Sequence, residues 1–156
     1  MLSKAGHAFS NSLNHQEGNF VIDEVDQMSE SEFKELLYHL FKQQGYLVNL
    51  PPKSDNLDAD LVLRKGKDVI IVQAKRNTAN VGVSAINAVV GANGYDNATN
   101  KWVVTNRYYT KAAINQAHKN KVKLFNRDDF LIMLKDYRAP KSKWRKAIKS
   151  TQHKRD

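Results

Sequence analysis

Cysteine is absent from this chain of 156 residues, and so are other features on which common protein functions depend. Without cysteine there is no disulfide framework, no thiolate zinc site and no thiol nucleophile, and a reducing cytoplasm is the expected location. No apolar run approaches the roughly 18 residues of a membrane span, so no membrane partner is expected. The chain has no GxxxxGK[ST] phosphate loop, which argues against a nucleotide cofactor. Its five histidines lack the HxxxH-type spacing of a histidine-ligated metal.

Acidic residues are scarce at the end of the chain, where basic residues gather. From Arg138 onward eight lysines and arginines stand against one acid, so this tail carries +7 of the net charge of +9 and leaves +2 for residues 1–137. Such an excess favours a polyanionic partner, although a solubilising tail is the alternative. The tail residues expected to contact DNA phosphates are Lys141, Lys143, Trp144, Arg145, Lys146 and Lys149.

Three segments of the chain differ in pattern. Residues 1–27 are polar and aperiodic and are expected to form a flexible N-terminal arm, and residues 138–156 form the basic tail. Between them, residues 28–137 carry the periodic apolar patterns of one folded domain. Ser29 and Glu32 form a capping box that predicts the start of a helix, and Gly45 is expected to close it.

The middle of the domain has the pattern of a β-hairpin. Asp60–Arg64 and Asp68–Lys75 are predicted strands, joined by a turn at 65–67. The apolar run 69–72 indicates a strand buried on both faces and central in its sheet. Helix and strand patterns then alternate, which gives the order α-β-β-β-α-β-α-β-α. The predicted fold is therefore an α/β domain with a mixed central β-sheet flanked by helices.

The residues best suited to chemistry gather at one end of this hairpin. Alternation puts Gln73 and Lys75 on one face of their strand. Lysine is rarely buried without a partner, so either the strand emerges into solvent at Lys75 or the pair faces a carboxylate. Pairing residue 64 with 68 about the turn sets Asp60 opposite residue 72, within one position of Gln73. The hairpin thus supplies a candidate carboxylate.

A carboxylate, an amide oxygen and an ammonium at one strand edge suit the hydrolysis of a phosphodiester. Mg²⁺ typically keeps several waters and uses one or two carboxylates together with substrate phosphate. The ion polarises the phosphate and acidifies a water, while an ammonium offsets developing negative charge. We therefore expect Asp60 and Gln73 to bind Mg²⁺ or Mn²⁺, with Lys75 as a further catalytic residue.

At these residues the chain resembles the Mrr-like restriction endonuclease family of the PD-(D/E)xK nuclease superfamily. The likeness covers about 110 residues, from Met28 to Tyr137. The stretches that carry it are Ser31-Glu32-Phe33, Gly45-Tyr46, Asp60-Leu61-Val62, Val72-Gln73-Ala74-Lys75-Arg76, Val81-Gly82-Val83, Gly91-Ala92 and Val103-Val104-Thr105-Asn106. The resemblance implies a restriction-endonuclease-like fold, in which Asp60 binds metal, Gln73 replaces the usual acidic residue and Lys75 is catalytic.

One position departs from that family. A glutamate often follows the first-helix phenylalanine there, whereas this chain has Lys34. Glu32 flanks the apolar stripe of the helix and is a further candidate for a catalytic role, with helix capping as the alternative. Lys34 argues against a two-metal arrangement.

The sequence as a whole predicts a metal-dependent endodeoxyribonuclease of the restriction type that acts on duplex DNA. One alternative is a junction or repair nuclease with the same chemistry. Another is a DNA-binding module whose site has decayed, which Lys34 favours. Arg76, next to Lys75, is expected to contact DNA. A homodimer is also expected, because a chain with one site must act twice to cut both strands of a duplex.

Overall fold

The computed structural model describes residues 22–51, 59–92 and 97–137. The basic tail and most of the predicted N-terminal arm lie outside these residues, so the tail contacts predicted above stay predictions. Within the described residues no helix is both long and apolar enough to cross a membrane. The elements, in chain order, are α2 (Ile22–Asp26), α3 (Glu30–Gln43), β1 (Leu47–Asn49), β2 (Leu61–Lys65), β3 (Asp68–Lys75), α4 (Val83–Val90), β4 (Asn100–Thr105), α5 (Lys111–Lys119), β5 (Val122–Phe125) and α6 (Arg127–Asp136).

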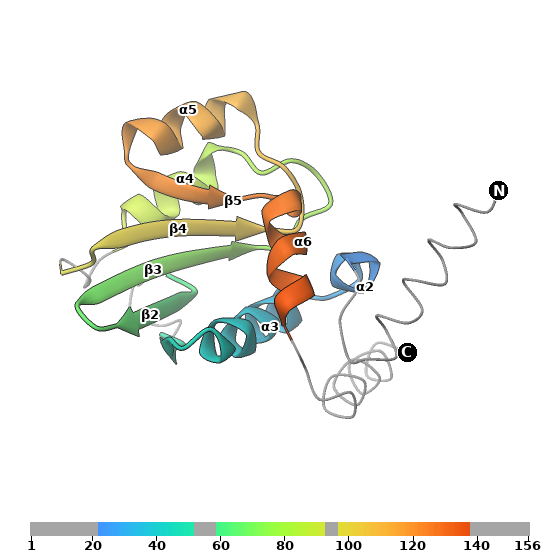
Figure 1. Cartoon of the computed structure of the whole chain (residues 1–156). Helices are drawn as coiled ribbons and strands as arrows, with labels where there is room; N and C mark the ends of the chain where they lie inside the picture. The colour runs from blue at the N-terminus through green and yellow to red at the C-terminus, as the bar shows by residue number, and fades with distance from the viewer. Residues whose placement is uncertain (1–21, 52–58, 93–96, 138–156) are drawn as a thin grey trace.

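The five strands form one mixed sheet in the order β1-β2-β3-β4-β5. The hairpin strands β2 and β3 pair antiparallel, as β1 and β2 do, whereas β3, β4 and β5 run parallel. In Figure 1 α3 lies on one face of this sheet and α4 and α5 lie on the other. The predicted α/β fold with a mixed central sheet and flanking helices is confirmed.

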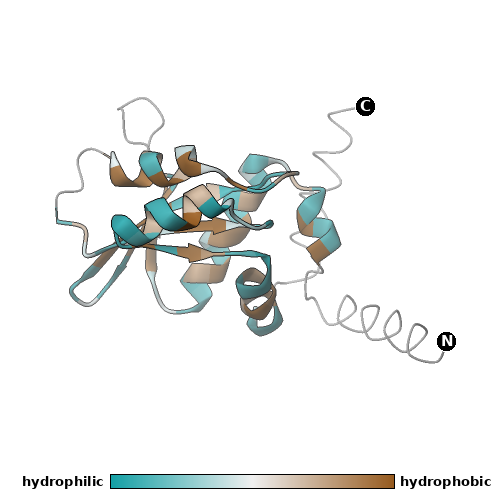
Figure 2. Ribbon diagram, turned by 90° about the horizontal axis from the view of Figure 1, so that it is seen from above, coloured by the Kyte–Doolittle hydropathy of each residue, from teal (hydrophilic) through white to brown (hydrophobic). Residues whose placement is uncertain are grey.

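Each face of the sheet has its own apolar core. Side chains of β3 alternate between the two cores, so that Ile70 and Val72 pack toward α3 and Ile71 packs toward α4. In Figure 2, seen from above, the helices carry both hydrophilic and hydrophobic residues, and hydrophobic stretches lie along the strands. β3 is buried on both faces from Val69 to Gln73, which confirms its predicted central position.

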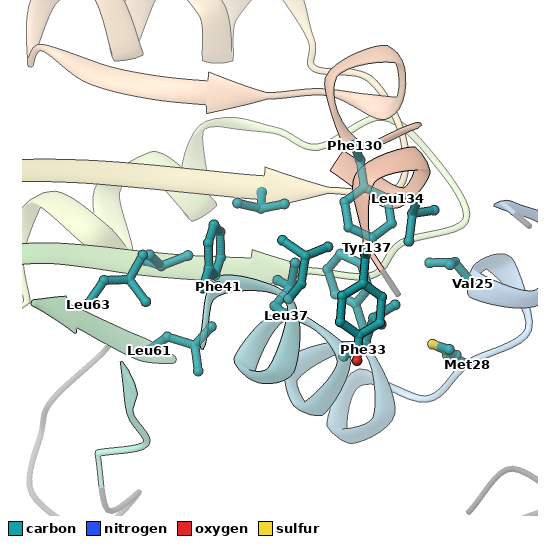
Figure 3. Packing of buried hydrophobic residues seen from close by; sticks show 14 of the residues in the cluster. Val25, Met28, Phe33, Leu37, Phe41, Leu61, Leu63, Phe130, Leu134 and Tyr137 are labelled. Atoms are coloured by element: carbon teal, nitrogen blue, oxygen red, sulfur yellow. The ribbon is translucent and has the colours of Figure 1, made fainter. Parts of the chain in front are cut away.

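The first helix signal is confirmed in detail. Ser29 Oγ accepts the Glu32 N–H at 3.1 Å, and Glu32 Oε1 accepts the Ser29 N–H at 2.9 Å. Phe33, at the start of α3, meets Phe130 of α6 edge to face, with the ring centroids 5.4 Å apart. Figure 3 shows the apolar side chains that gather at this end of the α3 core, among them Val25, Met28, Phe33, Leu37, Phe130, Leu134 and Tyr137.

The prediction of an arm over residues 1–27 needs correction at its described end. Residues from Ile22 form α2, and Val25 is wholly buried in the α3 core. Acidic residues surround Val25 in the sequence, so the composition of this stretch is polar although one side of the helix is apolar. Ile22, Val25 and Met28 recur every three residues, which is a short helical signal that places one face against the core.

The hairpin register also differs by one residue from the prediction. Lys65 pairs with Asp68, so the turn has two residues, Gly66 and Lys67, and β2 begins at Leu61. Gly66 takes φ +58°, a conformation that glycine adopts without strain and that two-residue hairpin turns require. The ladder pairs Leu61 with Val72, so Asp60, one step further, comes level with Gln73.

Candidate active site

Asp60 lies where the chain enters β2, and its carboxylate turns toward the end of β3. Its backbone N–H donates to the Val72 carbonyl at 2.9 Å, which continues the ladder by one bond. Its Oδ2 accepts the backbone N–H of Ala74 at 2.8 Å. The carboxylate is therefore held against the backbone between the two other predicted site residues, Gln73 and Lys75.

Gln73 is the first polar residue after the buried run of β3. The residue is only 8% exposed, and its Oε1 is buried with no hydrogen-bond partner among the described residues. Burying an amide oxygen without a hydrogen-bond partner costs about 1–3 kcal/mol of folding free energy, and a ligand bound to this atom would offset that cost. A divalent cation, which prefers oxygen ligands, is a suitable one.

Lys75 ends β3 and is partly buried. Its backbone carbonyl accepts the Thr105 hydroxyl, which fixes the strand end against β4. Within the described part of the chain the Lys75 ammonium has no ion-pair or hydrogen-bond partner. Strand alternation gives Lys75 the same face as Gln73. An uncommitted ammonium thus follows two residues after an uncommitted amide oxygen.

Lys34, the departure noted in the sequence, contacts the predicted metal ligand directly. Its Nζ lies 3.0 Å from Asp60 Oδ1, and the two side chains are 22% and 19% exposed. A pocket of about 400 Å³ adjoins this ion pair. The lining residues come from α3, the end of β1 and the start of β2, and are Ser31, Lys34, Glu35, Tyr38, His39, Leu50, Pro51 and Asp60.

Two other candidates make contacts of a different kind. The Glu32 carboxylate accepts a backbone N–H in the capping box, which is the structural role foreseen for it, and its catalytic role stays a prediction. The Arg76 guanidinium donates from Nη1 to the Asp26 carbonyl at 3.3 Å, so it is turned toward α2. DNA contact by Arg76 also stays a prediction.

A polar cluster at the carboxyl ends of β3 and β4 escaped the sequence prediction. The Asp26 carboxylate of α2 accepts two hydrogen bonds from Arg127, both 2.9 Å long, and a third from Asn106 Nδ2 at 2.9 Å. Asn106 is 1% exposed, and its Oδ1 accepts the Asn77 N–H at 2.8 Å. This cluster, here called the Asp26 clasp, joins α2, α6 and the segments that follow β3 and β4.

Opposing effects act on the Asp26 carboxyl. Desolvation raises its pKa, but the hydrogen bonds from Arg127 and Asn106 and the charges of Arg127 and Arg107 outweigh this, and the net pKa lies below the usual value. The hydrogen bond to Asp26 in turn raises the pKa of Arg127. Asp26 is therefore ionised at neutral pH, and the clasp is a charged pair.

In their chemistry, the candidate donors are of the kind that a hard divalent ion prefers. Asp60 supplies a carboxylate and Gln73 a buried oxygen without a partner, while no three acidic, histidine or cysteine side chains converge anywhere in the described residues. Such a set leaves several coordination positions to water and substrate phosphate, which is typical of Mg²⁺. It does not provide the carboxylates of a fully protein-built metal cage.

Comparison with known families decides the affiliation. A family model described as restriction endonuclease, the Mrr catalytic domain, matches residues 25–134. The chain belongs to the Mrr restriction endonuclease family. This confirms the resemblance drawn from the sequence. No curated protein matches the sequence.

Two solved structures resemble the Mrr domain described here. One is a protein of unknown function, AF1548, with 14% identity and a TM-score of 0.52 over 62% of this chain. The other is MspJI restriction endonuclease in complex with a 27-mer oligonucleotide, with 18% identity and a TM-score of 0.47 over 65% of this chain. The chain spans 57% of the first protein and 27% of the second. The first likeness supports the fold alone.

Proposed function

We propose that the chain is a metal-dependent endodeoxyribonuclease that hydrolyses phosphodiester bonds of duplex DNA at Asp60, Gln73 and Lys75. The observation that carries the proposal is the contact of Asp60 Oδ2 with the Ala74 N–H at 2.8 Å. It holds a carboxylate beside the two residues whose polar atoms, Gln73 Oε1 and Lys75 Nζ, have no partner in the described part of the protein.

Each residue has a distinct role in this proposal. Asp60 Oδ1 and Gln73 Oε1 would hold one Mg²⁺ or Mn²⁺ ion. When bound, that ion would supply Lewis-acid polarisation of the scissile phosphate and a water of lowered pKa. The Lys75 ammonium orients the attacking water and stabilises the negative charge that grows on the phosphate oxygens. The water oxygen bonds to phosphorus and releases a proton to solvent, the bond from phosphorus to the leaving sugar oxygen breaks, and that oxygen takes up a proton from solvent.

The test is cleavage of a supercoiled plasmid in Mg²⁺ or Mn²⁺. Loss of one preorganised donor costs on the order of 10²–10³ in rate, so Lys75→Ala is expected to remove detectable cleavage. Duplex binding and the melting temperature should stay close to those of the parent. Lys67→Ala is the matched control, because Lys67 is an exposed lysine in the turn of the same hairpin. It should cleave at the parental rate.

Two results would refute the catalytic assignment. One is a Lys75→Ala protein that nicks plasmid as fast as Lys67→Ala. The other is a Lys75→Ala protein that unfolds, which would make Lys75 a structural residue. A comparison of linear duplex with four-way junctions in the same assay separates a restriction-type nuclease from a junction nuclease.

A non-hydrolytic DNA-binding module is the second candidate. The contact of 3.0 Å between Lys34 Nζ and Asp60 Oδ1 favours it, because an ammonium already neutralises the carboxylate that the metal would use. This candidate predicts that the parental protein binds duplex DNA but cleaves it with neither metal ion.

For the nuclease, we propose a homodimer that places one site on each DNA strand. We also propose that it acts inside the cell.

A further inference from the structure

Both oxygens of the Asp60 carboxylate have partners, but the two partners differ in their freedom to leave. Oδ2 accepts the Ala74 N–H, which is fixed in the backbone of β3. Oδ1 contacts the Lys34 ammonium at 3.0 Å, and that group ends a flexible four-carbon side chain. Both side chains of the pair are about one-fifth exposed, so solutes reach them. Lys34 is therefore the partner that can be exchanged.

We propose that Lys34 couples metal binding to DNA binding. Without DNA its ammonium holds Asp60 Oδ1 and weakens the binding of a divalent ion. When a duplex docks, the ammonium moves to a backbone phosphate and leaves Oδ1 to the metal. This inference rests on the proposed function, and it gives Lys34 a role within a working site instead of a decayed one.

Competition at Asp60 follows from charge. A divalent ion on Oδ1 would sit a few ångströms from the Lys34 ammonium, and like charges at that separation repel. The metal therefore binds well only if the ammonium leaves. Lysine keeps its charge on a compact group and binds phosphate as a point charge, so a DNA phosphate is a natural acceptor for it.

The structure also gives the Lys34 side chain room to move. The pocket of about 400 Å³ opens beside it, so the ammonium can swing away from Asp60 without displacing the core. Glu35, the other acid that lines this pocket, lies 3.8 Å from His39 on the next turn of α3. A DNA phosphate that reaches this pocket offers the ammonium a further anionic partner.

Thermodynamic linkage makes the coupling reciprocal. If DNA tightens metal binding by a given factor, the metal tightens DNA binding by the same factor. Because the pair is partly exposed and solvent screens it, we expect Lys34 to account for a factor of about five to ten. The DNA phosphate as a metal ligand adds a separate contribution, which does not depend on Lys34.

The test is a titration with Mn²⁺ in which electron paramagnetic resonance reports the free ion, with and without a short duplex. The parent, Lys34→Met and Lys42→Met are compared. Lys42 is an exposed lysine on the same helix, so its variant matches the loss of charge. We expect Lys34→Met to bind Mn²⁺ about five- to tenfold more tightly without DNA. The tightening caused by the duplex should fall by the same factor, and Lys42→Met should behave as the parent.

The outcomes separate this inference from the proposed function. If Lys34→Met and Lys34→Gln bind Mn²⁺ like the parent without DNA, the coupling role is wrong while the metal site stands. If neither the parent nor the Lys34 variants bind Mn²⁺ with DNA present, the metal site fails and the coupling fails with it. Circular dichroism verifies that the variants are folded, and Asp60→Asn should abolish Mn²⁺ binding in each case, so that the free-ion signal stays at its full height.

Discussion

Replacement of Asp26 by alanine tests how strongly the Asp26 clasp stabilises the domain. The carboxylate accepts three hydrogen bonds of 2.9 Å, two from Arg127 and one from Asn106. Hydrogen bonds to a charged group contribute about 1.5–3 kcal/mol each when fully buried. Here the Asp26 side chain is 26% exposed and that of Arg127 17%, so water replaces part of the loss. We expect Asp26→Ala to lower the free energy of unfolding by about 2–3 kcal/mol.

Urea denaturation followed by circular dichroism measures this change. In a thermal melt of a chain of this size, each kcal/mol of lost unfolding free energy lowers the melting temperature by roughly 3–4 °C. The melting temperature of Asp26→Ala should therefore fall by about 10 °C. Asp23→Ala is the control, because Asp23 is an exposed acid on the same helix, and it should change stability by less than about 0.5 kcal/mol.

A double variant shows where the cost arises. Asp26→Ala leaves the Arg127 guanidinium partly buried without its carboxylate. Adding Arg127→Met removes that uncompensated charge, so the double variant should lose less stability than the two single changes together. An Asp26→Ala protein as stable as Asp23→Ala would refute the reasoning, because the clasp would then contribute nothing.

Three further predictions concern pH, metal and salt. Because the folded-state pKa of Asp26 is lowered, the stability that this carboxylate contributes is present above its unfolded pKa of about 3.9 and is lost as pH falls through the folded value. The free energies of unfolding of the parent and Asp26→Asn, measured in urea, should thus differ by a constant amount above about pH 5 and converge below about pH 4. A constant difference down to about pH 2 would contradict this. Calorimetry with Mn²⁺ should show a weak signal that Asp60→Asn removes, whereas an unchanged isotherm would move the metal elsewhere. Removal of residues 138–156 should flatten the salt dependence of DNA binding by about 3.6 log units per log unit of salt if half of its eight cations touch phosphates, and equal slopes would make the tail a solvated extension.

Local patterns explain why the hairpin end could be predicted from the sequence. A strand repeats every two residues, so the spacing of Gln73 and Lys75 fixes their common face without any tertiary information. A short turn then sets the register, which brings Asp60 to the same end of the sheet. The predicted register of the hairpin was wrong by one residue because the sequence around Gly66 is compatible with both a two-residue and a three-residue turn.

Long-range contacts explain what the sequence did not reveal. Lys34 and Asp60 lie on different elements, and no periodic pattern relates a helix residue to a residue ahead of a strand. α2 has only five residues, too few for a window that detects helical periodicity. Asp26, Asn106 and Arg127 meet only once the sheet has formed, since each comes from a separate part of the chain.

The clasp also bears on the order in which the protein becomes complete during synthesis. Asp26 and Arg127 are 101 residues apart, and the chain leaves the ribosome from its N-terminus. α2 is among the first described segments to emerge, yet its carboxylate has no guanidinium to bind until α6 follows. Arg76 and Asn106 already bond to Asp26, and Asn77 to Asn106, before residue 127 emerges, so only the charge partner of Asp26 arrives late. A nascent chain that stops before Arg127 therefore leaves the Asp26 carboxylate without its guanidinium and the α3 core without Phe130 and Leu134, so a prematurely ended product should be markedly less stable.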